Sequence, residues 1–303
     1  MKKKRRILIV CCVLVFVLLI VPFGLSIYIY ERIFSTRYET PAMQSAAEYD
    51  GLISEQTSFV SDDGQRLAGY RYYYEEVAPR GVMIFAHGLG SGGHLPYLPI
   101  INYFAAHGYP VFTYDATGNG ESEGKDANGF PQGTIDLDYA IDLVEEDFAL
   151  PIVLFGHSWG AYSCGCVLNE HPEVRAVVSA AGPDDSIDLI AYFGEQHAGK
   201  GADVLLPYLS VYEYFKFGKY STYTCCEGFR NSDCGVMILH SRDDTIVEDE
   251  VCCEVYEDEF EDDARFRFLE YENRGHSGLF YAGGRLDESL MEQILAFYDD
   301  NIS

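Results

Sequence analysis

Positive charge is scarce in this sequence. Its 303 residues include 21 Lys and Arg against 48 Asp and Glu, which gives a net charge of −27. Five of the cations are residues 2–6, and the first thirty residues contain no acid, so the remainder carries −32. Such an acidic surface repels nucleic acids, and we expect no nucleic-acid partner. Apolar residues make up 48% and charged residues 23%, which excludes a disordered, collagen-like or coiled-coil chain.

Regularly spaced cysteine pairs are also missing. Seven cysteines lie outside the first thirty residues, and they are Cys164, Cys166, Cys225, Cys226, Cys234, Cys252 and Cys253. No C-x-x-C spacing occurs among them, so we expect no zinc site, and we expect no cofactor. The odd number leaves at least one thiol unpaired, while the cluster at 225–253 favours one or two disulfides without fixing their pairing.

Charge is absent from residues 7–30, a run of 24 mostly apolar residues that is long enough to cross a membrane as a helix. A cleaved signal peptide has a shorter apolar region and a small-residue cleavage site, neither of which occurs here. We therefore favour an uncleaved, single-pass anchor in the cell membrane over a signal peptide. The cations at 2–6 predict a cytoplasmic N-terminus and an extracytoplasmic body.

The rest of the chain alternates short apolar strands with helices. Strands are expected at 57–61, 67–74, 82–86, 111–114, 152–155, 174–180, 236–240 and 266–271. Helices are expected at 97–107, 134–148, 161–169 and 287–298. This order is typical of an α/β protein with a mostly parallel sheet covered on both faces. We divide the chain into an anchor (1–30), a linker (31–56) and an α/β body (57–303).

More than fifty residues separate two of the expected strands. This segment, about residues 183–234, is called the insertion below, and it is rich in Tyr, Phe and Leu. It is expected to be helical. It could pack on the edge of the sheet or act as a lid whose aromatic side chains form a substrate pocket, and the two are compatible. Its length and placement favour the lid.

A G-x-S-x-G sequence at 156–160 places Ser158 between an expected strand and an expected helix. The glycines are needed there because the turn is tight, and the turn exposes the serine at the carboxyl end of the sheet. Ser122 lies in a second copy of the pattern, but that copy follows its strand by six residues and leads into more loop. The context therefore selects Ser158 as the nucleophile.

A serine nucleophile needs a base and an orienting acid, which follow it in the order Ser, Asp, His in this arrangement. His276 is the only histidine after residue 247 and lies in a polar loop that follows an expected strand. Asp243 and Asp244 are both available after another strand. Because adjacent side chains cannot aim alike, only one of them is expected to orient His276.

Acyl transfer also needs backbone N–H groups that face the oxyanion. One is expected from Trp159, directly after the nucleophile, and the other from the glycine-rich loop at 87–93. That loop lacks the G-K-[ST] ending and the G-x-G-x-x-G spacing of phosphate-binding loops, so a phosphate site is set aside.

These segments together resemble the α/β-hydrolases, in the branch of monoacylglycerol-lipase-like and S33-aminopeptidase-like serine hydrolases. The matching segments are His-Gly-Leu-Gly at 87–90, Asp-Ala-Thr-Gly-Asn-Gly-Glu-Ser at 115–122, Gly-His-Ser-Trp-Gly at 156–160, Arg-Asp-Asp-Thr-Ile-Val at 242–247 and Gly-His at 275–276. The resemblance implies Asp244 as the acid, three residues before Val247, and the backbones of Leu89 and Trp159 as the oxyanion hole. Thr117 and Asn119 stand where the family usually has Arg or His.

The resemblance implies a membrane-anchored serine hydrolase that cleaves carboxylic esters through Ser158, His276 and Asp244. The apolar insertion and the anchor lean towards a small or lipidic ester substrate. A peptidase or amidase with the same machinery is the alternative within the class, and a catalytically silent surface binding module is the alternative outside it.

Overall fold

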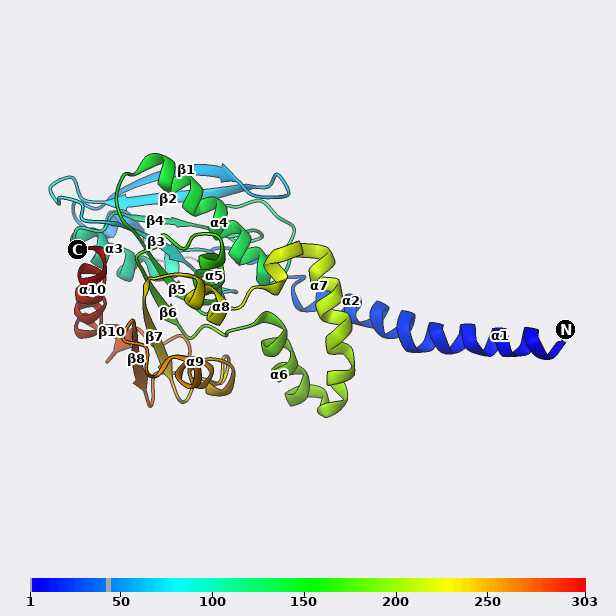
Figure 1. Cartoon of the computed structure of the whole chain (residues 1–303). Coiled ribbons are helices and arrows are strands. Elements are labelled where there is room, and N and C mark those ends of the chain that lie inside the picture. Colours follow the sequence, from blue (N-terminus) through cyan, green and yellow to red (C-terminus); the bar gives the residue numbers. More distant parts are fainter. Residues whose placement is uncertain (1, 42–44) are drawn as a thin grey trace.

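The computed structural model describes residues 2–41 and 45–303, and Figure 1 shows a three-layered body with a long N-terminal helix projecting from one side. The body is built on an eight-stranded sheet with the order β1-β2-β4-β3-β5-β6-β7-β8. Its strands are β1 (Ile53–Val60), β2 (Arg66–Tyr73), β3 (Val82–Ala86), β4 (Val111–Tyr114), β5 (Ile152–His157), β6 (Ala176–Ala180), β7 (Gly235–Ser241) and β8 (Phe266–Tyr271). The pairings β1–β2 and β2–β4 are antiparallel, and the other five are parallel.

The sheet is buried on both faces, because its central strands are mostly apolar and all of their residues are buried. Alternate side chains of β3 enter different cores, with Met83 and Phe85 on one face and Val82 and Ile84 on the other. Helices α3 (Leu98–Ala106) and α10 (Glu288–Ile302) cover the first face. Helices α4 (Phe130–Asp147), α5 (Trp159–Cys166), α8 (Cys225–Asn231) and α9 (Cys253–Phe260) cover the second. The expected mostly parallel α/β sheet is confirmed.

The insertion is helical. It consists of α6 (Ser186–Ala198), a 3₁₀ segment at Lys200–Leu205, α7 (Leu206–Phe217), a second 3₁₀ segment at Gly218–Thr222, and α8. In Figure 1, α6 and α7 stand beside the body, next to the point where the N-terminal helix leaves it.

The N-terminal helix is continuous from α1 (Lys2–Val15) through a π-helical segment (Phe16–Ile20) into α2 (Val21–Ile33). It is the one helix in the described ranges that is long and apolar enough to cross a membrane, and none of its most apolar part is buried against the body. Length and composition alone fit an anchor or a signal sequence. The C-terminal helix α10 lies at the opposite side of the body (Figure 1).

Several boundaries differ from expectation for local reasons. Helix α4 begins at Phe130, four residues before the expected start, because Pro131 suits a first helical turn. Helix α9 and the short hairpin of β9 (Tyr281–Ala282) and β10 (Arg285–Leu286) were not expected. The hairpin offers only two residues per strand, which is too short for a periodic pattern.

No disulfide joins the cysteines at 225–253, for which one or two had been considered: all nine cysteines are free in the part of the chain that the structure describes. Those of the body are buried separately in the core. Even the sulfur atoms of Cys166 and Cys225 lie 4.0 Å apart, about twice the length of a disulfide bond. Burial raises the pKa of the Cys166 thiol well above its ordinary value, which keeps it unreactive.

Candidate active site

Ser158 occupies the turn between β5 and α5, with φ 55° and ψ −118°. A non-glycine residue in this region is strained, and such strain is characteristic of functional turns. The flanking glycines are required sterically. A Cβ on Gly156 would lie 2.3 Å from the carbonyl oxygen of Gly160, and a Cβ on Gly160 would lie 2.0 Å from that of Ala86. The sequence therefore produces a sharp turn with Ser158 at its tip.

Ser122, in the second copy of the pattern, has a different environment. Its hydroxyl accepts a hydrogen bond from the backbone N–H of Ala68 at 2.8 Å and donates one to the carbonyl of Asp115. The side chain is buried and fully engaged in fixing the loop to β2. It is not presented to a cavity as Ser158 is.

The loops after β7 and β8 bring Asp244 and His276 together. The Nδ1 of His276 lies 2.7 Å from Oδ2 of Asp244, and Oδ1 of Asp244 accepts hydrogen bonds from the backbone N–H groups of Ile246 and Val247. Burial acts to raise the pKa of Asp244, but these hydrogen bonds and the His276 ring outweigh it and hold the pKa below its ordinary value. Asp244 is therefore an ionised, fixed acceptor.

The neighbouring Asp243 points elsewhere. Its Oδ1 accepts hydrogen bonds from the hydroxyl of Ser241 at 2.6 Å and from the backbone N–H of Gly275 at 2.8 Å. The side chain is exposed to solvent at the surface of the loop. Asp243 thus ties down the segment that carries His276 without touching its ring.

A cavity of about 290 Å³ lies in front of Ser158. Ser158 and His276 both line it, together with the glycine-rich loop, and the further lining residues are Gly88, Leu89, Gly90, Ser91, Pro96, Tyr97, His157, Ser277, Phe280 and Tyr281. None of these residues belongs to the insertion, so its role as a wall of the substrate pocket stays a prediction.

Two backbone N–H groups belong to residues at or beside this cavity, since Leu89 lines it and Trp159 directly follows Ser158. Those of Leu89 and Trp159 donate to no other residue in the described ranges. Trp159 is the first residue of α5, and its indole N–H donates to the carbonyl of Phe130 at 2.7 Å, which fixes the start of the helix. The N–H of Gly88 is unavailable because it donates to the hydroxyl of Tyr97. The positions expected for the oxyanion hole therefore have free donors.

His157 is a site residue that the sequence did not single out. Its Nδ1 lies 2.8 Å from the hydroxyl of Tyr97, and its Nε2 lies 3.1 Å from the carbonyl oxygen of His276. Burial, aided by repulsion from the His276 ring, lowers the pKa of His157 to about 3, so the ring is neutral. Its proximity to His276 arises only from the fold, because 119 positions separate the two residues.

A second unexpected contact supports the glycine-rich loop. His94 donates from its backbone N–H to Oδ1 of Asp115, and its ring nitrogen Nδ1 lies 2.8 Å from the same oxygen. Asp115 also accepts from the backbone N–H of Glu121. The carboxylate thus joins the loop at 87–94 to the loop at 115–122, two of the segments that carry the family resemblance.

The loop at 115–122 has Thr117 and Asn119 where the family usually has Arg or His, and the structure shows which other groups hold this loop. The N–H and hydroxyl of Thr117 both donate to the buried carboxylate of Asp136. Arg37 lies in the segment that was expected to be a linker. Its guanidinium donates to the carbonyls of Gly120, Ser122 and Gly124 at 2.7–3.0 Å. A cation therefore does hold this loop, but it comes from residues 31–56.

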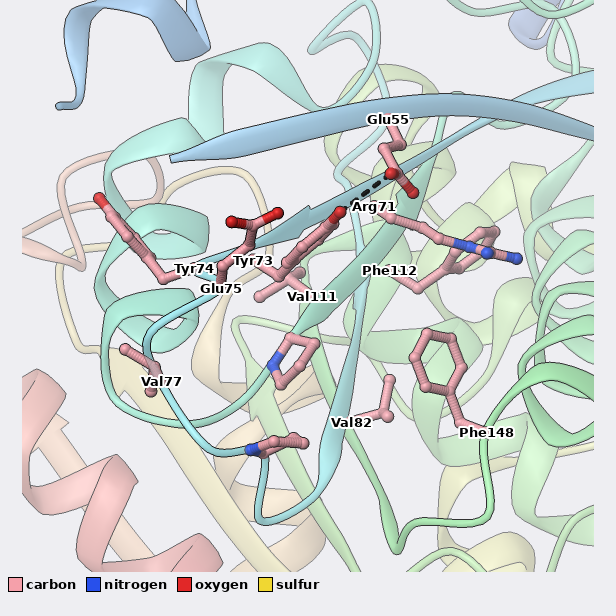
Figure 2. Close-up of a pocket in the computed structure, with 12 residues that line it drawn as sticks. Glu55, Arg71, Tyr73, Tyr74, Glu75, Val77, Val82, Val111, Phe112 and Phe148 are labelled. Carbon is pink, nitrogen blue, oxygen red and sulfur yellow. Dashed lines mark hydrogen bonds between the residues drawn. The ribbon is translucent and has the colours of Figure 1, made fainter. Parts of the chain in front are cut away.

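A cavity of about 360 Å³ lies elsewhere, between β2, β4 and the end of α4 (Figure 2). Its lining includes Arg71, Tyr73, Phe112 and Phe148, and Figure 2 shows the hydroxyl of Tyr73 bonded to Glu55. It contains none of the candidate site residues. A volume larger than that of the cavity in front of Ser158 therefore does not by itself identify the site.

Comparison with known proteins defines the class. A family model described as serine aminopeptidase, S33, matches residues 77–224, a range that includes Ser158 and ends before Asp244 and His276. An esterase of Pyrococcus furiosus superposes with a TM-score of 0.69 at 17% identity, covering 88% of this chain and 100% of that one. No curated protein matches the chain in sequence.

Two further structures are similar at the level of the fold. Est1E of Butyrivibrio proteoclasticus, determined with ferulic acid bound, has a TM-score of 0.61 at 15% identity and covers 81% of this chain and 99% of that one. An acylaminoacyl peptidase of Pyrococcus horikoshii has a TM-score of 0.62 at 16% identity and covers 84% of this chain and 43% of that one. The chain has the α/β-hydrolase fold. Within that class it is similar to the serine aminopeptidase S33 group and shares its fold with esterases.

Proposed function

We propose that the chain is a serine hydrolase in which Ser158 is the nucleophile, His276 the general base and Asp244 the orienting acid. The observation that carries the proposal is the 2.7 Å contact between His276 and Asp244, beside a cavity that Ser158 also lines. Asp244 accepts from Nδ1 and so leaves Nε2 of His276 as the proton acceptor.

The reaction follows from these positions. Ser158 attacks the carbonyl carbon while His276 takes the hydroxyl proton, and the resulting oxyanion is bound by the N–H groups of Leu89 and Trp159. His276 then gives its proton to the leaving group, and an acyl-enzyme forms. Water then attacks the acyl carbonyl carbon while His276 removes its proton, and the second oxyanion collapses with cleavage of the bond to Ser158, whose oxygen takes the proton back from His276 as the acid is released. No metal or cofactor is required at any step.

Carboxylic esters are our preferred substrates, and peptides or amides are the second candidate. The esterases of similar fold support the first, whereas the S33 aminopeptidase family model and the acylaminoacyl peptidase support the second. The same catalytic groups serve both reactions, since the leaving group accepts a proton from the same histidine in each. We favour a lipidic ester because the body is joined to an apolar helix.

We also propose that the apolar helix is retained as a membrane anchor through residues 7–30. Ser26, Tyr30 and Phe34 are all buried against the body, and Tyr30 donates a 2.6 Å hydrogen bond to the buried carboxylate of Glu213. Cleavage after the apolar run would remove or expose these groups. With the cations at its tip in the cytoplasm, the body lies outside the cell membrane.

A fluorophosphonate probe tests the proposed chemistry, because it reacts covalently with an activated serine. Labelling of Ser158 in the wild-type protein is expected, and its absence would favour a catalytically silent binding module. A panel of p-nitrophenyl esters and aminoacyl amides then ranks the two substrate classes by kcat/KM. A higher value for the amides would reverse our preference.

A further inference from the structure

The insertion has an apolar face on its outer side. Helix α7 buries Leu209, Glu213 and Phe217 against the body. The opposite side carries apolar side chains that are exposed to solvent and are spaced three or four residues apart. These residues are Val204, Pro207, Val211, Tyr214 and Phe215. We call this set the α7 face. Val211 is 48%, Tyr214 56% and Phe215 77% exposed, which is unusual for large apolar side chains that lie together.

The α7 face is free of negative charge in an otherwise acidic protein. Residues 204–219 contain a single acid, Glu213, and it is buried. The two cations of this stretch, Lys216 and Lys219, are each paired with a glutamate, Glu31 and Glu170. The body as a whole is repelled by anionic headgroups, whereas the α7 face itself is uncharged, with the exposed Asp203 next to it at Val204.

The apolar N-terminal helix is fixed to the other side of α7. Glu213 accepts hydrogen bonds from the hydroxyls of Tyr30 at 2.6 Å and Ser186 at 2.7 Å, all of them buried. Glu31 accepts from Tyr212 at 2.7 Å and pairs with Lys216 at 2.6 Å. The helix and the insertion are therefore one packed unit rather than a body on a loose tether.

Two contacts show which way the α7 face points. The hydroxyl of Ser26 donates to the carbonyl of Leu205 at 3.4 Å, and that of Tyr208 donates to the carbonyl of Leu18 at 2.6 Å. Leu18 is eight residues nearer the N-terminus, about 12 Å farther along the helix from the body. Tyr208 lies beside the α7 face in the helical pattern, so we infer that this face looks along the apolar helix and away from the sheet. Figure 1 shows α7 on the side of the body from which the N-terminal helix projects.

We propose that the α7 face inserts into the boundary between headgroups and acyl chains of the bilayer that the N-terminal helix crosses, on the side of the body. This inference rests on the proposed membrane anchor. The ligand is the apolar boundary itself and not an anionic headgroup, because the face offers apolar area and no unpaired cation. The insertion then fixes the body at the membrane surface, where an amphiphilic ester is concentrated.

The test uses the full-length protein in phosphatidylcholine vesicles whose acyl chains carry bromine, which quenches nearby tryptophan. Trp159 is buried and gives the background signal. In Phe215→Trp, we expect strong quenching beyond that background. The matched control is Val60→Trp, because Val60 is 56% exposed on the edge strand β1 and should remain in water and unquenched.

A second pair of variants gives a functional measurement. Val211→Asp should lower hydrolysis of a long-chain ester held in the vesicles by about tenfold, the factor that burial of one apolar side chain is worth. It should leave hydrolysis of a water-soluble p-nitrophenyl ester unchanged. Val60→Asp, at a valine of similar exposure, should change neither rate.

The outcomes separate this inference from the proposals on which it rests. Retention of the protein after an alkaline wash, without quenching at position 215, would overturn the inference and leave the anchor in place. Release by the wash would refute both the anchor and the inference. Cross-linking between copies through position 215 would assign the α7 face to a second copy of the chain and also overturn it. Loss of hydrolysis with quenching intact would count only against the proposed chemistry.

Discussion

The adjacent residues Asp243 and Asp244 have different roles because their side chains contact different groups. Asp244 is buried against the His276 ring, whereas Asp243 is exposed and bonds Ser241 and a backbone N–H. The sequence offered both acids, and only the resemblance to a family selected one of them. The spacing of residues does not fix the directions of two neighbouring side chains in a loop.

Neutralising the two acids should therefore have unequal effects. Asp244→Asn should lower kcat by about 10⁴, the scale seen when the orienting acid of a triad is lost. Asp243→Asn keeps an oxygen acceptor for Ser241 and Gly275 and should cost far less. Steady-state kinetics on a soluble ester measure both, and a larger loss from the Asp243 variant would move the assignment by one residue.

Substitution of the two serines in the repeated G-x-S-x-G pattern should likewise have unequal effects. Ser158→Ala should abolish turnover and probe labelling while the melting temperature changes little, because the hydroxyl of Ser158 bonds to no other group within residues 2–41 and 45–303. Ser122→Ala should retain labelling but lose about 1–3 kcal/mol of stability, since it leaves a buried backbone N–H and carbonyl unpaired. Equal loss of labelling in both variants would contradict the assignment.

At the scale of helices, strands and loops, the regular elements were predictable and the segments that join them were not. Apolar runs such as β3 and β5 identify buried strands because every position faces a core. Residues 31–56, expected as a linker, instead contact the body in their first part. Tyr38 forms a parallel bridge with Asn119, and Thr40 donates to the carbonyl of Gly92. Such contacts leave no periodic pattern in the sequence.

Arg37 should be important for stability in a way that a linker residue is not. Its guanidinium donates to three carbonyls of the loop at 120–124, and Arg37→Ala would leave them without this donor. We expect a loss of about 2–4 kcal/mol, on the basis of about 1 kcal/mol for each hydrogen bond. Arg37→Lys should recover only part of it because one ammonium cannot reach all three. Thermal unfolding of the two variants measures the difference.

A pH dependence is expected where α4 meets the segment after α5. The ring of His171 lies 2.6 Å from Asp138 and 3.0 Å from Glu173. Burial acts to lower the pKa of His171, but the two carboxylates outweigh it and raise the pKa to about 8. The contribution of this histidine to stability is therefore complete below about pH 6.5 and is lost as the pH rises through about 8.

His171→Gln should accordingly destabilise the protein more at pH 6 than at pH 9. The difference between the two losses should be about 2 kcal/mol, since each pKa unit corresponds to about 1.4 kcal/mol. Urea unfolding of wild type and variant at both pH values gives the four free energies required. Equal losses at the two pH values would mean that the ring is neutral throughout.

The whole molecule is asymmetric, with the apolar helix on one side and the C-terminal helix on the other (Figure 1). The length and composition of residues 7–30 suffice to suggest an anchor, but a signal sequence would look similar. Burial of Tyr30 is the additional observation that favours retention, and it depends on a partner, Glu213, 183 positions away. Sequence alone cannot supply a contact over that distance.

The proposed topology is tested on intact cells. External protease should degrade the body, and the untreated protein should be found in the membrane fraction at its full mass. A soluble body that lacks about the first thirty residues would identify a signal peptide instead. A body protected until the cells are opened would reverse the orientation.

The hydrogen bond between Tyr30 and Glu213 also bears on whether the span can be exchanged. In many anchored proteins the membrane helix can be exchanged for any apolar helix of similar length. Here a foreign helix would leave Oε1 of the buried Glu213 without its donor while Ser186 still serves Oε2, and an unpaired buried oxygen costs several kcal/mol unless the group takes up a proton. Chimeras should therefore be joined on the N-terminal side of Ser26, so that the last two turns of the native helix travel with the body.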